Sequence, residues 1–485
     1  MENFLYIHLS MTIIFSILLV VLGNEKSFSP LNSTYIKLAK ERFMSLDPTK
    51  LPDPPMPSYT FVIYHRDVFE KSKFKGYDSL IEKRLARCHA RANSLASIFE
   101  IGNRTARGSK ISHEKVPKST STHYANGEYV ASFMLGSQEV KNYLLVDTGS
   151  DLVWWQCGPC EPNKCYEQKL QPLYVPTNSK VFRKIDCFLH SERCLDDLDL
   201  NYKCTSDHSC TYDVKYASGE RSKGYMADDV ITFVLDQRPV RIIFGCGQDQ
   251  TNGTAFSGEF SGVVGLGRRK IIGGYSLPTQ FGADLMSMCL PPYYSAKEST
   301  LSFHKTIFPR ATSAKLILNL KYPSFYFVDL YKVFINDKEV QLSPSWWNFR
   351  KDLTGGVLLD TGTFISRFPQ EFYTLFRYVF REEVRDIPLV DTPAEPFDTC
   401  YKADPSREVN FPVVKLYFGS VSPSTMLLLV NERVVVHFNG QYCMAFLPWE
   451  RPFAILGSNQ LQGVGLTFDT SANTVSFDID ACIKL

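Results

Sequence analysis

Two aspartates stand in matching sequence contexts that could carry acid–base chemistry. The first copy spans residues 144–150 (LLVDTGS) and the second spans residues 357–363 (VLLDTGT), with Asp147 and Asp360 at equivalent places. Two carboxylates held close together cannot both ionise cheaply, so they share a proton. The ionised member can then activate a water as general base while the protonated member polarises the carbonyl that the water attacks. This chemistry needs neither a metal nor a covalent intermediate.

The residues after each Asp have supporting roles. In each copy the Gly permits a tight turn, the Thr hydroxyl can hydrogen-bond across an interface between two lobes, and the last hydroxyl can donate to its own Asp. One Asp-Thr-Gly is compatible with an ordinary turn between strands. Two copies, 213 residues apart and each preceded by an apolar run, predict two related lobes that each present one carboxylate. The expected supporting residues are Thr148, Gly149, Ser150, Thr361, Gly362 and Thr363.

Composition narrows the class of protein. The chain has 485 residues, 44% apolar and 13% aromatic, which predicts a packed globular protein of two or three domains. A formal net charge of +2 gives no support for nucleic acid or an anionic membrane as a partner. From residue 127 onward, short β-branched and aromatic runs alternate with turn residues, which predicts an all-β architecture. One helix is expected within it, over residues 368–384, because its apolar residues recur at helical spacing.

The N-terminal part has a different character. Residues 11–23 form a thirteen-residue apolar run, which favours a cleaved signal peptide (residues 1–23) over a retained anchor because it is too short to span a bilayer. Residues 24–60 and 102–126 are expected to be linkers. Between them we expect a strand over residues 61–64 and a helix over residues 80–99 with one apolar face.

Thirteen cysteines in an exported chain predict disulfides. A redox site at residues 157–160 (CGPC) is less favoured because the surroundings are strand-rich. A zinc site formed by Cys157, Cys160, Cys165 and His190 is also less favoured, because exported cysteines usually pair with one another. Asn252 begins a glycosylation sequon, as do Asn32 and Asn103. Cys88 stands alone, and the remaining twelve are Cys157, Cys160, Cys165, Cys187, Cys194, Cys204, Cys210, Cys246, Cys289, Cys400, Cys443 and Cys482.

These motifs together resemble the pepsin-like aspartic proteases, and among them the plant nepenthesin-like group. Both Asp-Thr-Gly segments match, and the twelve-cysteine pattern is the most specific mark of the group. Three departures concern the flap and substrate subsites: residues 136–139 (GSQE), residues 217–220 (ASGE) and Phe364. The other matching segments are residues 244–247 (FGCG), 262–267 (GVVGLG) and 454–458 (AILGS), with residues 65–67 (HRD) and 87–91 (RCHAR) similar to the prosegment.

The resemblance implies a bilobed all-β fold with a prosegment at residues 24–118, lobes at 119–308 and 309–485, and a monomeric endopeptidase. It implies polypeptide substrates, pepstatin-type inhibitors, no cofactor, no metal, and secretion to the apoplast or passage to a vacuole. It also implies a flap tyrosine at Tyr216 that contacts Trp154. It pairs Cys400 with Cys443 and Cys289 with Cys482. A catalytically silent protein resembling plant xylanase inhibitors is the alternative, but both motifs are intact here.

Charge suggests how such a precursor would be held inactive. Residues 61–118 contain thirteen Lys and Arg against six Asp and Glu, whereas residues 119–485 contain thirty-five against forty. A basic segment along an acidic, carboxylate-centred cleft would be held at neutral pH and weakened in acid. A Lys or Arg near the two aspartates would keep both ionised and block the shared-proton state. The alternative is a basic helix face that is merely solvated.

Overall fold

The computed structural model describes most of the chain beyond residue 58. The signal segment (residues 1–23) and the Asn252 sequon lie outside the described residues, and no helix among the residues described is both long and apolar enough to cross a membrane. The described residues are 37, 40, 41, 44, 59–106, 122–123, 128–160, 163–190, 194, 202–216, 221–232, 239–250, 259–268, 276–293, 299–306, 313–320, 322–341, 343, 355–403, 409–419, 425–479 and 481–482.

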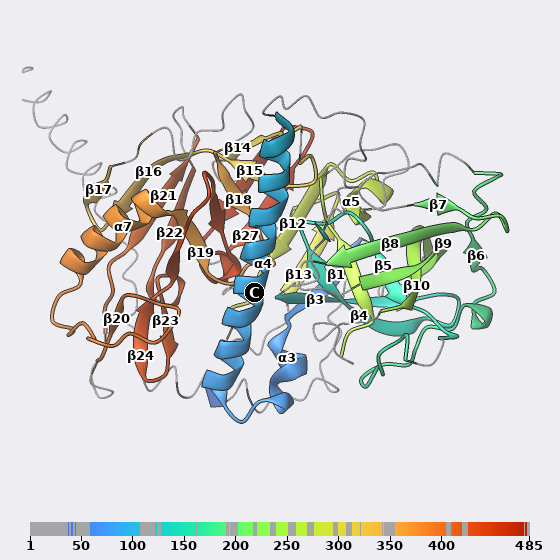
Figure 1. Ribbon diagram of the computed structural model, residues 1–485, viewed down its shortest axis with the longest axis horizontal. Helices are drawn as coiled ribbons and strands as arrows, with labels where there is room; N and C mark the ends of the chain where they lie inside the picture. Colours follow the sequence, from blue (N-terminus) through green and yellow to red (C-terminus); the bar gives the residue numbers. More distant parts are fainter. Residues whose placement is uncertain are drawn as a thin grey trace, which may run out of the picture.

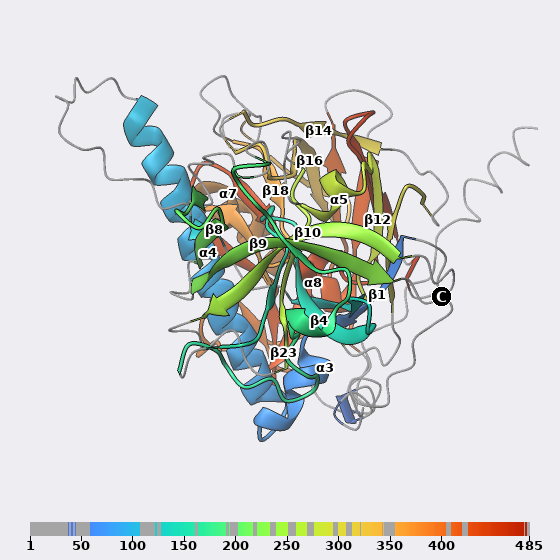
Figure 2. The same cartoon turned by 90° about the vertical axis from the view of Figure 1, so that its right-hand side faces the viewer.

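Two strand-rich halves make up the body, with the long helix α4 (Tyr77–Ala106) between them in Figure 1. Figure 2 shows the same helix along one side of the body, so it covers the junction of the halves and does not pass through the core. The predicted all-β, two-lobed architecture is therefore confirmed.

The first half begins with the hairpin of β3 and β4, and its longest hairpin is β9 with β10. The first three residues of β3 are all buried, and buried and partly exposed residues alternate over the rest of the strand. Its elements are β2 (Thr122–His123), β3 (Tyr129–Leu135), β4 (Val140–Asp147), β5 (Trp154–Gln156), β6 (Arg183–Lys184), β7 (Lys203–Cys204), β8 (Cys210–Tyr216), β9 (Arg221–Thr232), β10 (Pro239–Asp249), β11 (Gly262–Gly265), α5 (Leu277–Gln280), β12 (Leu285–Cys289) and β13 (Ser299–Phe303).

The second half contains the predicted amphipathic helix, observed as α7, whose buried face is aromatic. Its elements are β14 (Ser313–Ile317), β15 (Phe327–Val328), β16 (Leu330–Ile335), β17 (Lys338–Val340), β18 (Val357–Leu359), β19 (Ser366–Pro369), α7 (Gln370–Glu383), β20 (Cys400–Tyr401), β21 (Val414–Phe418), β22 (Thr425–Leu429), β23 (Val435–Phe438), β24 (Gln441–Met444), β25 (Phe446–Trp449), β26 (Ala454–Leu456), α8 (Ser458–Leu461), β27 (Gly465–Asp469) and β28 (Thr474–Asp478).

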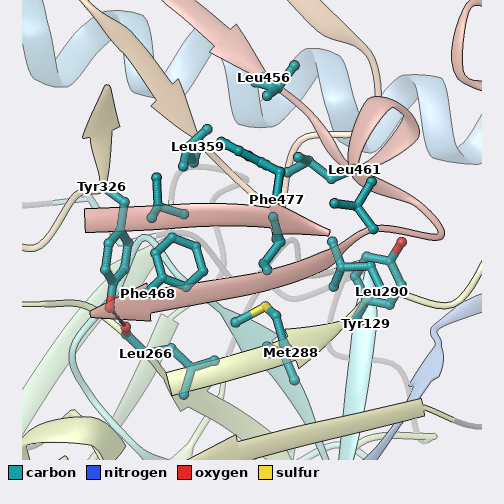
Figure 3. Close-up of a cluster of buried hydrophobic side chains, with 14 of the residues drawn as sticks. Tyr129, Leu266, Met288, Leu290, Tyr326, Leu359, Leu456, Leu461, Phe468 and Phe477 are labelled. Carbon is teal, nitrogen blue, oxygen red and sulfur yellow. Dashed lines mark hydrogen bonds between the residues drawn. The ribbon is translucent and has the colours of Figure 1, made fainter. Parts of the chain in front are cut away.

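A continuous sheet joins the halves. Its strands follow the order β3, β1, β13, β12, β27, β28 and β14, so β1 (Thr60–His65) is inserted between two strands of the first half. Figure 3 shows the apolar cluster beneath this sheet, in which Tyr326 and Phe468 of the second half face Leu266 and Met288 of the first. Because this cluster removes apolar surface of both halves from water, the halves pack as one body.

Some local expectations are corrected by tertiary contacts. The linker expected over residues 102–126 is partly structured, because α4 continues to Ala106 and β2 pairs with β8. The linker expected over residues 24–60 has helical residues at 37, 40, 41 and 44. Residues 325–335, an apolar run that could form one strand, are divided between two sheets: β15 pairs with β14 and β18, whereas β16 joins β17 and β21.

All twelve cysteines beyond Cys88 form disulfides, and Cys88 is a buried free thiol. The two pairs that the resemblance implied are confirmed. Within the CGPC segment the two cysteines pair elsewhere, which excludes a dithiol redox site there. The bridges are Cys157–Cys246, Cys160–Cys165, Cys187–Cys204, Cys194–Cys210, Cys289–Cys482 and Cys400–Cys443.

Candidate active site

Each Asp of the repeated motif is positioned by a pair of parallel strands. Asp147 is the last residue of β4, which runs parallel to β11, and its carbonyl accepts a 2.8 Å hydrogen bond from the amide of Leu266. Asp360 follows β18, which runs parallel to β26, and its amide donates to the carbonyl of Leu456 at 3.1 Å. Residues 262–267 and 454–458, two of the segments that carry the resemblance, therefore supply the parallel partners of the two motif strands.

The two turns meet through their threonines. The hydroxyl oxygens of Thr148 and Thr361 lie 3.3 Å apart, and the amide of Thr361 donates to the Thr148 hydroxyl at 3.4 Å. Both side chains are buried. This contact across the junction fixes one turn against the other, as the sequence predicted for the threonines.

The glycine amides orient the carboxylates. The amide of Gly149 donates to Asp147 Oδ1 at 2.9 Å, and the amide of Gly362 donates to Asp360 Oδ1 at 3.1 Å. A backbone donor aimed at a carboxylate favours its ionised form and limits its rotation. The two aspartates therefore receive the same backbone support.

The hydroxyl residues that end the motif differ between the copies. The Thr363 hydroxyl donates to Asp360 Oδ2 at 2.5 Å, as expected from the sequence. The expected counterpart is not formed: among the described residues, neither Ser150 Oγ nor Asp147 Oδ2 has a hydrogen-bond partner, although both atoms are buried. A serine carries no γ-methyl to hold its hydroxyl in one rotamer, so equivalent sequence positions do not give equivalent contacts.

A single arginine from α4 occupies the space between the carboxylates. Arg91 donates from Nε to Asp360 Oδ2 at 2.9 Å and from Nη2 to Asp360 Oδ1 at 2.8 Å. The same Nη2 donates to Asp147 Oδ1 at 3.2 Å. Because one nitrogen contacts both residues, the two carboxylates converge on one point, and Arg91 is completely buried there.

The absence of a side chain at Gly149 makes room for this arginine. A Cβ built at Gly149 would lie 2.4 Å from Arg91 Nη2, well inside van der Waals contact. Glycine is therefore needed at this position of the first motif for the close approach of the guanidinium.

A buried charge network anchors the start of α4. Arg87 makes two hydrogen bonds to Glu128, at 3.0 Å from Nε and 2.7 Å from Nη2. Arg84 contacts Asp67, and Arg66 donates to Glu70 at 2.9 Å. Every one of these six side chains is buried, so the network excludes water where the N-terminal segment meets the first half.

Two groups in this network have displaced pKa values. Burial alone would raise the pKa of Glu70, but Arg66 and Arg87 hold it at about 2. Burial and the nearby charge of Arg84 hold the pKa of His65 well below its usual value. Its Nδ1 accepts from the amide of Asp67 at 3.2 Å, so the packed imidazole is neutral.

The other face of α4 is apolar and also buried. Leu95 and its neighbours pack against Phe325, Trp449 and Phe453 of the second half, while Cys88 contacts the backbone of Ile365 near the second motif. The helix is therefore buried on its apolar face and along its row of arginines. The alternative of a solvated basic face does not apply to these arginines.

The predicted flap contact is only partly described. Trp154 lies in β5, completely buried in the core of the first half. Tyr216 ends β8, its side chain lies outside the described residues, and so do residues 217–220. Contact between the two remains a prediction.

Sequence reasoning placed a basic segment near the aspartates but did not single out Arg91. The available signal was the spacing of Arg84, Arg87 and Arg91, which recur at i, i+3 and i+7 and so share one side of a helix. Arg87 and Arg84, which anchor the helix, lie four and seven residues before Arg91, which contacts the carboxylates.

Comparison with known proteins identifies the family of the chain. Models of the xylanase inhibitor N-terminal and C-terminal families match residues 129–303 and 325–478. Aspartyl protease family protein 2 of Arabidopsis thaliana is 30% identical over 88% of this chain and 85% of its own length. Aspartic proteinase nepenthesin-2 of Nepenthes gracilis is 28% identical over 75% of this chain and 80% of its own.

Solved structures support the fold. The crystal structure of edgp gives a TM-score of 0.58 at 19% identity, over 75% of this chain and 94% of that one. Basic 7S globulin from soybean gives a TM-score of 0.54 at 19% identity, over 72% and 92%. With both family models matched in order and the two Asp-Thr-Gly turns joined across the lobes, the chain belongs to the plant pepsin-like aspartic protease family, which shares its two-domain model with xylanase inhibitors.

Proposed function

We propose that this chain is an aspartic endopeptidase made as an inactive precursor, with Asp147 and Asp360 as its catalytic pair. The observation that carries the proposal is the convergence of both carboxylates on one guanidinium nitrogen of Arg91. Two carboxylates this close would share one proton once the arginine leaves. Its relatives are named as aspartic proteases, and intact motifs favour an enzyme over a silent binding protein.

Hydrolysis would follow from the pair without a cofactor or a metal. The ionised carboxylate takes a proton from a water lying where Arg91 now sits, and the protonated carboxyl donates to the carbonyl oxygen of the scissile peptide. The resulting tetrahedral adduct collapses when its nitrogen accepts a proton and the C–N bond breaks. The glycine amides and the Thr363 hydroxyl keep the carboxylates in place.

In the precursor Arg91 would block each requirement of this mechanism. Its charge stabilises both carboxylates in the ionised state, so no proton is shared. Its guanidinium fills the water site, and α4 covers the apolar surface on the second lobe where a polypeptide would lie. Residues 24–118 are accordingly proposed as an intramolecular inhibitor.

Acid would release the segment because its partners titrate in the required direction. Protonation of the carboxylates removes the attraction for Arg91, which stays charged at any relevant pH. Cleavage between about residues 110 and 125 would then yield the mature enzyme. We further propose that the protein is exported, as the apolar leader and six disulfides suggest, and acts as a monomer.

The test uses residues 24–485, produced with disulfides intact. The precursor is incubated at neutral and at acid pH, and its N-terminus and its cleavage of denatured casein are measured with and without pepstatin. We expect activity only after processing, and none in Asp147→Asn or Asp360→Asn. Substantial turnover by either folded variant would exclude the pair. A processed, folded and wholly inactive wild type would favour the silent binding protein.

A further inference from the structure

A cavity separate from the two aspartates lies at the junction of the lobes. Its volume is about 250 Å³, and its walls come from both halves of the molecule. Arg268, which follows β11, lines it beside Tyr326 and Phe468 of the second lobe, with its guanidinium carbon 6.0 Å from the centre of the Tyr326 ring. Met286 of β12 adds a further apolar surface. Figure 3 shows Tyr326 and Phe468 side by side within the apolar cluster.

Arg268 is the unusual member of this wall because it is 9% exposed and has no acidic partner among the residues described. It donates from Nη1 to the carbonyl of Ile317 at 3.2 Å and from Nη2 to Asn473 Oδ1 at 3.0 Å. Both acceptors are neutral. Of the five N–H groups of a guanidinium, these bonds use two.

A buried cation without a counter-ion is costly, and the described partners of Arg268 are the two neutral acceptors and the Tyr326 ring, whose centre lies 6.0 Å from the guanidinium carbon. Burial lowers the pKa of Arg268, and the weak opposing influence comes from the Tyr326 phenol and not from a carboxylate. Every other arginine that is buried against the two aspartates or in the anchoring network has a carboxylate partner. The unused donors of Arg268 therefore suit an anion supplied from outside the chain.

We propose that this cavity binds a small amphipathic carboxylate, with its anionic group on Arg268 and its apolar body against Met286, Tyr326 and Phe468. A planar carboxylate matches the fork of a guanidinium and accepts two parallel hydrogen bonds. The apolar walls favour a hydrocarbon or aromatic body over a free inorganic ion. Asp284 stands at the rim, where it is exposed and its repulsion of an anion is screened by solvent.

The position of the cavity is close to the framework of the candidate active site. The Tyr326 hydroxyl donates to the carbonyl of Leu266 at 2.8 Å, and Leu266 is the residue whose amide bonds to Asp147. The carbonyl of Tyr326 accepts from the amide of Leu359, which precedes Asp360, at 2.9 Å. The cavity wall thus touches the backbone beside both motifs, although the ligand itself would not reach the carboxylates.

Isothermal titration of the full precursor at neutral pH tests the proposal, with 3-phenylpropionate as probe and 3-phenylpropionamide as its neutral match. We expect one site for the carboxylate and at least tenfold weaker binding of the amide. Arg268→Met should weaken carboxylate binding at least tenfold, whereas Asp284→Asn should preserve or tighten it. No binding of the carboxylate, or equal binding of acid and amide, would overturn the proposal.

Two further variants fix the location. Arg91→Met should leave the affinity unchanged, and a loss there with retention in Arg268→Met would move the site to the aspartates and overturn the proposal. Ala283→Phe fills the cavity while leaving Arg268 in place, and it should abolish binding even if Arg268→Met fails to fold. Retained binding in a folded Ala283→Phe protein would equally contradict the assignment.

Discussion

The two Asp-Thr-Gly turns have nearly the same sequence but different surroundings. Asp360 receives two hydrogen bonds from Arg91 and one from Thr363, whereas Asp147 receives one from Arg91 and none from Ser150. The shared residues determine the turn and its backbone donors. The contacts that differ come from Arg91 of α4 and from the Thr363 hydroxyl. Two nearly identical motifs therefore have different hydrogen-bonding surroundings.

Asp360 therefore makes most of the contacts with α4 at this site, whereas Asp147 Oδ2 has no hydrogen-bond partner among the residues that the structure describes. We expect this difference between the two turns to appear in the stability of variants at each position.

Removing the shared cation should have the largest effect. Arg91→Met leaves two buried carboxylates without their partner, so we expect the free energy of unfolding of the precursor to fall by about 3–5 kcal/mol. Denaturant unfolding at pH 7 measures this, and limited proteolysis should show earlier loss of the N-terminal segment. Lys83→Met, an exposed change on the same helix, is the control. Equal stability of the two variants would contradict the role of Arg91.

Changing one carboxylate at a time should reveal the asymmetry directly. Asp360→Asn removes two charged hydrogen bonds from Arg91, and Asp147→Asn removes one. We expect Asp360→Asn to destabilise the precursor by about 1.5–3 kcal/mol more than Asp147→Asn, the value of one hydrogen bond to a charged group. Unfolding of both precursors under identical conditions measures the difference. A reversed order would show that Arg91 is held chiefly by the first lobe.

The hydroxyl residues provide a smaller version of the same comparison. Thr363→Val removes a bond to Asp360 at nearly constant shape and should cost about 1.5 kcal/mol, the lower end for a hydrogen bond to a charged group. Ser150→Ala removes a hydroxyl with no partner and should change stability by less than about 0.5 kcal/mol. Thermal unfolding of both variants at pH 7 tests this ranking, and equal losses would refute it.

His65→Gln should change stability at neutral pH least of all these variants. Its effect should arise only at acid pH. The pKa of packed His65 lies well below 6.5, so the released segment binds a proton that the packed segment does not. Packing therefore loses stability as pH falls below about 6.5. Glu70 contributes stability that is present above its ordinary pKa of 4.5 and is lost as pH falls through about 2.

We expect His65→Gln to flatten the decline in melting temperature between pH 6.5 and the range where carboxylates titrate. The groups that face His65 include Arg84, Arg87, Arg66 and Glu70, and all remain in the variant. His89→Gln, at an exposed position of α4, is the control and should follow the wild type. Identical curves for all three proteins would place the acid response elsewhere.

Much of the framework was predictable from local sequence. The amphipathic pattern predicted the helix observed as α7 to within two residues at its start. The matched apolar runs predicted the strands that end at the aspartates, because a buried strand and a glycine turn are encoded over a few adjacent residues. The disulfide partners implied for Cys400 and Cys289 followed from resemblance alone and are present.

Other features depended on long-range packing. The split between β15 and β16 arises because two different sheets recruit adjacent residues, which no local pattern records. The unpaired hydroxyl of Ser150 and the carboxylate-free surroundings of Arg268 were likewise invisible, since both depend on which atoms lie across a lobe boundary.

Two equivalent aspartates, each between an apolar strand and a glycine, and a basic segment ahead of them can be identified in the sequence alone. Only the folded structure shows that Arg91, 56 residues from one aspartate and 269 from the other, is the cation between them. The two kinds of information differ in range. Strand, turn and helix propensities act between neighbours, whereas a buried ion pair forms only where the packing of two lobes and a helix excludes water around particular atoms.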